Sequence, residues 1–256
     1  MQLQNLSWPE IEKLTRDIPV LIPIAAIEQH GNHLPVSTDS DLLGEIVART
    51  EATMGSSFLS LPLQWLGNSH HHLDFPGTLS CSPRTYLDMV GGIVDNMLQH
   101  GFRRILILNG HGGNDVPGRQ VTFEVRQKYR ERDELLLLFS TYWQLAGPPA
   151  NTVPQLQQTE MGHACEWETS MMLAISPEHV GDYLSAEPLD PGVGFSPAER
   201  AWRTKQRTAE GHIGFPAQAT LEKGLALLEH FSCGVTKTIQ KMQSWDGQSW
   251  NAQSNA

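Results

Sequence analysis

The chain contains 256 residues, of which 39% are hydrophobic and 18% are charged. This length and composition are ordinary for one α/β domain and exclude an intrinsically disordered chain, so we expect a single domain over residues 1–256. The 28 acidic and 18 basic residues give a formal net charge of −10, which argues against a nucleic-acid partner because such binding needs a basic face.

Cysteines and apolar runs bear on the compartment. Cys81, Cys165 and Cys233 show no C-x-x-C spacing, so neither a disulfide framework nor a zinc ribbon is expected. The first residues lack the basic and apolar regions of a signal peptide, and no apolar run approaches the length of a membrane span. We therefore predict a cytoplasmic protein without a membrane partner.

Short apolar runs alternate along the chain with longer segments of helical periodicity. The predicted strands cover residues 19–26, 57–63, 104–108 and 134–142, and the predicted helices cover residues 39–53, 83–100, 115–130, 166–175 and 219–243. The alternation predicts a largely parallel sheet covered by helices on both faces. Two Pro-rich loops, residues 147–158 and 186–199, are typical of lids or binding edges.

Polar side chains follow the first predicted strand in residues 28–39, EQHGNHLPVSTD. Ligands of parallel sheets bind beyond the carboxyl ends of the strands. Glu28 and His30 project to one side of an extended backbone, and Asp39 stands where a helix begins. These residue types suit zinc or manganese. The alternative is a surface loop in which Asp39 is only an N-terminal helix charge.

A second polar segment, LNGHGGN at residues 108–114, follows the predicted strand 104–108. This position should place His111 on the same rim as Glu28. The glycines on both sides of His111 permit close backbone approach. A phosphate-binding glycine turn is disfavoured, because the chain has neither a P-loop lysine nor G-x-G-x-x-G here.

A third segment, GHACEWETS at residues 162–170, lies at the start of a predicted helix. His163 is a candidate general acid or base, and Glu166 is a candidate metal ligand. Glu168 has the alternative of a helix N-terminal carboxylate favoured by the dipole. Cys165 is expected to be a small buried residue.

Two further features are candidates for the rim of a site. Three consecutive histidines, residues 70–72, precede LDFPGTLS, but neighbours in sequence rarely face one ion, so we expect at most one to be functional. Trp143 follows the end of a predicted strand and is either an apolar wall for a substrate or a core residue.

Together these segments resemble the creatininase family of metal-dependent amidohydrolases. The resemblance runs from about residue 21 to residue 228 and includes EQHGNHLPVSTD, HHLDFPGTLS, NGHGGN, HACEWETS and GHIGFPAQATLEKG in the family's order. It implies a three-layer α/β/α sandwich with a mostly parallel central sheet. It also implies a small-molecule substrate, a homo-oligomer that is often a hexamer, and two divalent ions, zinc or manganese, with iron as a further candidate.

The resemblance assigns roles to the polar residues. Glu28 and His30 would each bind one ion, Asp39 would bridge the two, and His111 would complete the first site. His163 matches the family's general acid/base histidine.

The second ion would lack a ligand, because the creatininase enzyme has a glutamate where this chain has Gly113. Glu166 is the candidate replacement and Glu168 the next one, with Glu168 also assigned to the catalytic group. His72 matches the histidine before the family's F-P-G-T turn and is, like Trp143, a candidate substrate contact.

The expected reaction is hydrolysis of a C–N bond in a small cyclic amide or formamide. A hydroxide bridging the two ions would attack the carbonyl carbon, and His163 would protonate the leaving nitrogen. The Gly113 departure argues against creatinine itself as the substrate. The alternatives are hydrolysis of a ring ketone or lactone at the same centre, and a non-catalytic metal-binding protein. A serine hydrolase is disfavoured because no G-x-S-x-G elbow occurs.

Overall fold

The computed structural model of the chain describes residues 1–153 and 155–250, and its centre is a parallel sheet. The strands are β1 (Val20–Ile24), β2 (Leu59–Ser60), β3 (Arg104–Asn109) and β4 (Leu136–Thr141), in the order β2-β1-β3-β4. All neighbouring pairs are parallel, as predicted. β2 is shorter than expected because Pro62 has no N–H to continue the ladder.

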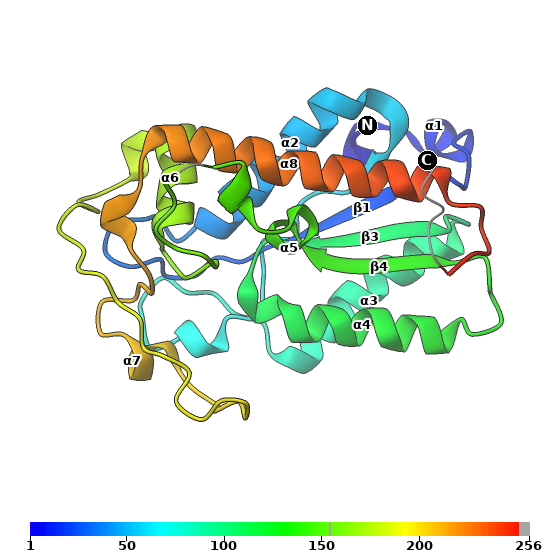
Figure 1. Ribbon diagram of the computed structural model, residues 1–256. Helices are drawn as coiled ribbons and strands as arrows, with labels where there is room; N and C mark the ends of the chain where they lie inside the picture. Colours follow the sequence, from blue (N-terminus) through cyan, green and yellow to red (C-terminus); the bar gives the residue numbers. More distant parts are fainter. Residues whose placement is uncertain (154, 251–256) are drawn as a thin grey trace.

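Helices cover both faces of this sheet (Figure 1). One face carries α2 (Thr38–Met54), α5 (Tyr142–Ala146), α6 (Glu166–Ile175) and α8 (Leu221–Ser244), and the other carries α3 (Pro83–Gln99) and α4 (Asp115–Lys128). Successive side chains of β1 alternate between two buried cores, with Leu21 in the first and Val20 and Ile22 in the second. The three-layer arrangement predicted from the sequence is confirmed.

Local signals explain most element boundaries. The Ser82 hydroxyl accepts a hydrogen bond from the Thr85 N–H and caps α3, and Gly101 has a φ of +89° just beyond that helix. The predicted strand at residues 134–142 was too long at its end. β4 ends at Thr141, whose side chain caps α5. The sequence pattern did not show α5, and it also missed α1 (Trp8–Glu12) and α7 (Thr204–Arg207). These helices are too short to show a helical period.

The carboxyl ends of three strands meet at one edge of the sheet. Ile24 of β1 pairs with Asn109 of β3, which pairs with Thr141 of β4. The Asn109 side chain accepts a hydrogen bond from the His111 N–H and donates one to the His111 carbonyl. The segments after β1, β3 and β4 therefore start side by side, with His111 held at the edge.

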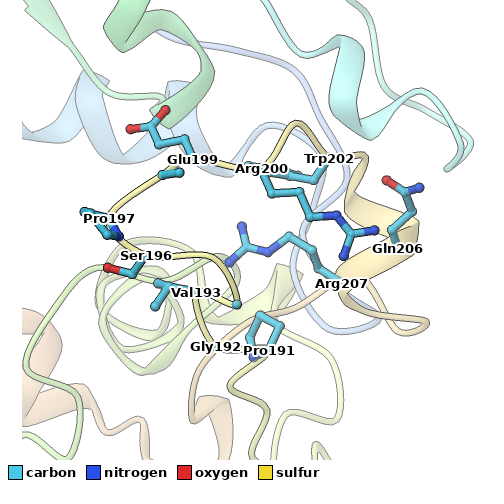
Figure 2. Close-up of a pocket in the computed structure, with 12 residues that line it drawn as sticks. Pro191, Gly192, Val193, Ser196, Pro197, Glu199, Arg200, Trp202, Gln206 and Arg207 are labelled. Atoms are coloured by element: carbon cyan, nitrogen blue, oxygen red, sulfur yellow. The ribbon is translucent and has the colours of Figure 1, made fainter.

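Residues 180–203, between α6 and α7, form neither a helix nor a regular strand. In Figure 1 this yellow segment runs toward α7 at the edge of the molecule. A cavity of about 370 Å³ lies among residues 191–207 and is shown in Figure 2. Within residues 1–153 and 155–250, no helix is both long and apolar enough to cross a membrane.

Candidate metal centre

A cavity of about 560 Å³ opens at the carboxyl edge of the sheet. Seven of the nine predicted site residues line it: Glu28, Asp39, His72, His111, Trp143, His163 and Glu168. His30 is fully buried directly behind the lining, with its ring centroid 4.3 Å from that of His163. Glu166 does not line this cavity.

Asp39 lies at the centre of the polar cluster. It occupies the first turn of α2, and its Oδ1 is 3.3 Å from His30 Nε2 while its Oδ2 is 3.0 Å from His111 Nδ1. Burial alone would raise the pKa of Asp39, but the nearby His30 and His111 rings outweigh burial and lower it strongly. Asp39 is therefore an ionised carboxylate with one oxygen toward each imidazole.

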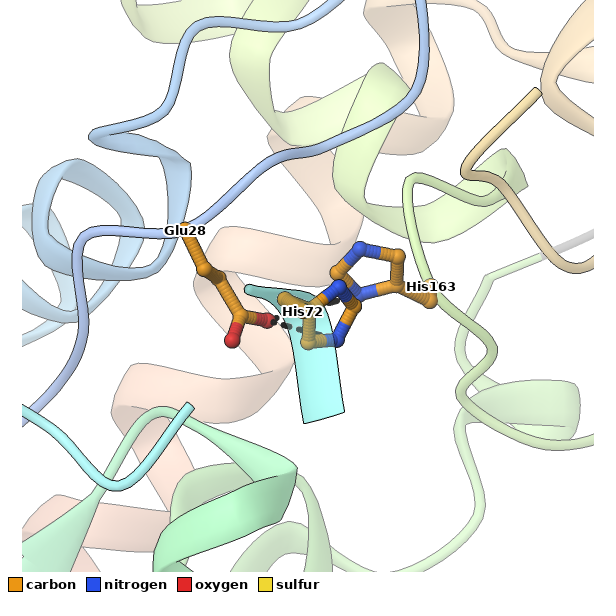
Figure 3. A group of neighbouring side chains, drawn as sticks. All are labelled: Glu28, His72 and His163. Carbon is orange, nitrogen blue, oxygen red and sulfur yellow. Dashed lines mark ion pairs between the residues drawn. The ribbon is translucent and has the colours of Figure 1, made fainter. Parts of the chain in front are cut away.

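Glu28 faces three imidazole rings. Its Oε1 lies 3.3 Å from His111 Nδ1, 3.5 Å from His72 Nε2 and 3.6 Å from His163 Nδ1. Figure 3 shows the carboxylate directed at His72 and His163, which come from segments far apart in the sequence. The Glu28 N–H donates to the carbonyl of Val36, which fixes the turn that presents the side chain.

The two carboxylates at the start of α6 have different surroundings. Glu168 Oε2 accepts a hydrogen bond from the Cys165 N–H, and its Oε1 lies 3.8 Å from His30 Nε2. Glu166 is engaged elsewhere, with Oε1 2.6 Å from Lys223 Nζ and Oε2 accepting the N–H groups of Gln157 and Gln158.

Glu166, which the sequence analysis gave as a candidate metal ligand, therefore lies outside the polar cluster. Residues two apart on a helix point about 200° apart, so only one of the pair can face the cavity. Glu168 takes the position expected for Glu166.

Each inner histidine is oriented by a backbone carbonyl. His30 Nδ1 donates to the Glu28 carbonyl at 3.0 Å, and His163 Nε2 donates to the Gln29 carbonyl at 2.8 Å. His111 Nε2 lies 3.2 Å from the Asn68 carbonyl. Because a carbonyl only accepts, each ring carries a proton on the nitrogen that faces the carbonyl, and its other nitrogen faces the carboxylates.

Unpartnered buried atoms test whether this cluster suits metal ions. Among residues 1–153 and 155–250, no hydrogen-bond partner is found for three buried atoms, Glu28 Oε2, His30 Nε2 and Asp39 Oδ2. Four overlapping groups of three potential ligands have their donor atoms within 4.8 Å of one another: Glu28–His72–His163, Glu28–His71–His111, His30–His163–Glu168 and Glu28–His30–Asp39. Nitrogen and carboxylate donors are the set that zinc and manganese take in proteins.

The titration of the histidines leads to the same conclusion. Burial would lower the pKa of His111, but Glu28 and Asp39 raise it to about 10. Burial would likewise lower the pKa of His30, yet Asp39 and Glu168 raise it well above its usual value. The carboxylates therefore favour positive charge beside them, which protons on the imidazoles supply and which divalent cations would supply in their place. The residues present fit a two-cation centre.

Gln29 is a site residue that the sequence did not reveal. Its Oε1 accepts the Gly31 N–H, and its Nε2 donates to the Gly211 carbonyl at 2.9 Å. The same Nε2 lies 2.7 Å from His72 Nδ1, so His72 Nδ1 is the acceptor and its Nε2 carries the proton toward Glu28. Only the fold, by bringing Gly211 to this place, shows this function of Gln29.

The triple-histidine turn contributes more than expected. Residues 70–72 form a single 3₁₀ turn, and both His71 and His72 line the cavity, whereas His70 is exposed. The His71 ring stacks against that of His111 with centroids 5.8 Å apart. Burial lowers the pKa of His71 to about 4, so its ring is neutral at pH 7.

The backbone at Gly113 leaves no room for a side chain. A Cβ placed there would lie 2.3 Å from the Asn68 carbonyl oxygen and 2.4 Å from His111 Nε2. The turn therefore packs directly against the ring and its carbonyl partner. With this backbone, no side chain at residue 113 fits without moving His111.

Trp143 and Cys165 have distinct environments. Trp143 follows β4, lines the cavity, and also packs against the core through Tyr142, edge to face at 4.8 Å. Both roles considered for it are therefore compatible. Cys165 is fully buried, as expected, and burial raises the pKa of its thiol to about 12.

The chain is similar to known proteins in both sequence and fold. Residues 4–239 match the family model described as creatininase, creatinine amidohydrolase. The creatinine amidohydrolase of Pseudomonas putida is 28% identical, covering 93% of this chain and 95% of the relative. A mycofactocin precursor peptide peptidase of Mycolicibacterium smegmatis is 28% identical, with 88% and 85% covered. A 3-dehydro-scyllo-inosose hydrolase of Thermotoga maritima is 23% identical, with 92% and 71% covered.

Solved structures of creatininase share the fold. One creatinine amidohydrolase structure superposes with a TM-score of 0.79 at 26% identity, covering 94% of this chain and 96% of the other. A creatininase structure described as the Mn form gives 0.79 at 26%, with 94% and 97% covered. A mutant creatininase of Zn-Zn type gives 0.78 at 26%, with the same coverage.

Proposed function

Because the chain belongs to the creatininase family of hydrolases, we propose that it is a binuclear metal-dependent amidohydrolase acting on a C–N bond of a small molecule. One observation carries this proposal. Glu28, His30 and Asp39 each direct a buried, unpartnered atom into a single cluster of carboxylates and imidazoles at the cavity wall. Such atoms are costly to bury unless a ligand completes them.

We assign the two ions to ligand sets that share one residue. Glu28, Asp39 and His111 would hold the first ion, and His30, Asp39 and Glu168 the second. Asp39 serves as the bridge because its two oxygens face His30 and His111 separately, at 3.3 and 3.0 Å. Glu168 replaces Glu166 in this assignment because both Glu166 oxygens are already bonded.

Two divalent cations, when bound, would supply the Lewis acidity that activates water and polarises a carbonyl. His163 supplies the proton transfer. Its Nε2–H is held by the Gln29 carbonyl, while burial and the nearby His30 lower its pKa to about 4, which leaves Nδ1 unprotonated at pH 7. Nδ1 can accept the proton of the attacking water and return it to the leaving nitrogen.

Other side chains of the cavity assist proton transfer or contact the substrate. Glu28 lies 3.6 Å from His163 Nδ1 and stabilises the imidazolium that forms in that transfer. His72 lines the cavity, and we assign it to substrate contact through the Nε2–H that faces Glu28. Trp143 contributes an apolar wall to the same cavity.

A small cyclic amide or a formamide is the substrate we favour. The relative from Pseudomonas putida is named for amide hydrolysis, and the 560 Å³ cavity is of small-molecule size. Hydrolysis of a ring ketone at the same centre is the second candidate, supported by the inosose hydrolase relative.

An activity screen with matched variants tests the proposal. Zinc- and manganese-loaded protein would be assayed against cyclic amides, formamides, cyclic ketones and lactones. We expect amide hydrolysis that falls about 10²–10⁴-fold in His163→Asn, while the exposed His70→Asn variant keeps wild-type activity. Turnover of ketones or lactones without amides would favour the second candidate. Equal loss in both variants, or no turnover by loaded protein, would contradict the amidohydrolase assignment.

A further inference from the structure

Two arginines line the cavity formed by residues 191–207 (Figure 2). Arg207 extends into it from the last turn of α7, and Arg200 lies beside it from the preceding loop. Arg207 and Trp202 line both this cavity and the larger cavity of the candidate metal centre. The two cavities therefore adjoin, and the Arg207 side chain lies at their junction.

The Arg207 guanidinium has no partner in the part of the chain that the structure describes. None of the described residues offers it a carboxylate oxygen within 4.0 Å. Arg203, four residues earlier, instead donates to both oxygens of Asp74 at 2.8 Å. Arg207 is half-buried, and its burial lowers its pKa despite the charge of Asp190. A partly desolvated cation with five free N–H donors is suited to an anionic ligand.

Trp202 holds this guanidinium in place. The Arg207 Cζ lies 4.5 Å from the centroid of the Trp202 ring. Stacking on an indole face fixes the plane of the guanidinium and leaves its N–H edge free, the geometry that binds carboxylate or phosphate oxygens in pairs. The Trp202 ring also makes a T-shaped contact with the His71 ring, with centroids 5.0 Å apart, and His71 stacks on His111. A row of rings thus links Arg207 to the carboxylates and imidazoles of the candidate metal centre, which we call the metal-facing cluster.

We propose that Arg207, with Arg200 beside it, forms an anion-binding subsite for a carboxylate or phosphate group of the substrate whose scissile bond lies at the metal-facing cluster. The inference rests on the proposed function, since it names the class of substrate for that site. The protein's net charge of −10 repels anions at long range, so recognition must be local. Glu199 also borders the outer cavity, but its carboxylate points away from both guanidinium groups in Figure 2.

Binding of three matched formamides tests the subsite separately from catalysis. N-formylglycine carries a carboxylate, N-formylethanolamine phosphate carries a phosphate, and N-formylethanolamine carries neither. Calorimetric titration would be done on the metal-loaded and the chelator-treated protein, for wild type, Arg207→Gln, Arg207→Lys and Lys205→Gln. Lys205→Gln is the matched control, because this variant removes the same charge two residues away and Lys205 lines neither cavity. Melting temperatures would show that each variant is folded.

At least one anionic formamide should bind wild type about tenfold more tightly than the neutral one, with or without metal. Arg207→Gln should abolish this difference, Arg207→Lys should retain part of it, and Lys205→Gln should leave it intact. Which anion gains affinity identifies the substrate as a carboxylate or a phosphate.

Equal losses in Arg207→Gln and Lys205→Gln would overturn the subsite, since only general charge would be involved. Anion preference that persists in Arg207→Gln and disappears with the metal would overturn it as well. If no loaded protein hydrolyses any formamide but the Arg207-dependent preference remains, the proposed reaction fails and the subsite stands.

Discussion

Two parts of the molecule border the same cavity but are built differently. The first is the inner cluster, which is the group of carboxylates and imidazoles at the candidate metal centre, and the second is the outer segment of residues 190–207. The inner side chains emerge from strand ends and first helical turns, are buried, and are oriented by backbone carbonyls. The outer segment is exposed over most of its length and has only the four-residue α7. The difference indicates that reaction chemistry resides in the inner cluster and substrate selection in the outer segment. Changes in the former should affect metal binding and turnover, and changes in the latter should affect which substrates bind.

The largest difference in metal content and turnover is expected between variants of the two glutamates of α6, because Glu168 belongs to the inner cluster and Glu166 does not. Glu168→Gln should lower metal content by about one ion and turnover by about a thousandfold, because loss of Lewis-acid stabilisation of about 4 kcal/mol corresponds to that factor. Its melting temperature should change little. Metal analysis by mass spectrometry and kinetic assays would measure this.

Glu166→Gln is the matched control for Glu168→Gln. It leaves Lys223, whose side chain is 11% exposed, without its carboxylate, which we expect to lower the free energy of unfolding by about 3 kcal/mol. Folded Glu166→Gln protein should still bind the full complement of metal. Loss of metal from Glu166→Gln, with retention in Glu168→Gln, would reverse the assignment of the two carboxylates.

A smaller effect is expected from Gly113→Ala. The new methyl group would meet the Asn68 carbonyl and His111 Nε2, so the His111 ring must shift. A displacement on the order of 1 Å should lower turnover about 10²-fold. Gly112→Ala is the control, because a Cβ there meets nothing within 4 Å. Equal activity of the two variants would show that the turn does not position His111.

Gln29→Leu should cost less, about 10–100-fold in turnover, because it removes a group that orients a site histidine rather than a ligand. Without the Gln29 amide, His72 is free to place its proton on Nδ1. The nitrogen chemical shifts of His72 should reveal that tautomer change, and metal content should stay at the wild-type level. An unchanged His72 tautomer would contradict the orienting role.

The smallest expected effect concerns stability against pH. Burial, together with His212 and His30, lowers the pKa of His33 from 6.5 to about 4, and His33 Nε2 lies 2.9 Å from the Thr169 hydroxyl. Between these values the unfolded chain binds more protons than the folded one, so stability is present above about pH 6.5 and declines as the pH falls toward 4.

Urea unfolding of chelator-treated protein would measure this decline. We expect His33 to account for about 1–2 kcal/mol between pH 7 and pH 5, after allowance for solvent screening. His33→Gln should show a shallower pH dependence, whereas the exposed His100→Gln should match wild type. Identical slopes for wild type and His33→Gln would contradict the assignment.

Much of the fold was predictable because its signals are local. Alternating apolar runs and helical periods gave the parallel sheet and the positions of α2, α3, α4, α6 and α8, with caps such as Ser82 at their ends. The rule that ligands bind beyond the carboxyl ends of parallel strands brought Glu28 and His111 together. Short elements such as α5 were missed because one turn carries no period.

The remaining features depend on contacts between distant segments. Whether Glu166 or Glu168 faces the cavity depends on the rotation of α6, which is fixed in part by Lys223 on α8. The function of Gln29 depends on Gly211, which lies 182 residues away in the chain. Arg207 carries no signal in the sequence, because only the fold shows that it borders the cavity and that none of the described carboxylates pairs with it.

The metal content of Asp39→Asn tests the central claim most directly. Wild-type protein should retain about two divalent ions per chain, and Asp39→Asn, which removes the proposed bridge, should retain about one or none. Asp41→Asn is the control, since Asp41 lies in the same first turn of α2 but bonds to Ser37 outside the cluster. Two ions retained in Asp39→Asn would contradict the bridging role, and a wild-type protein that binds no metal would contradict the binuclear centre itself.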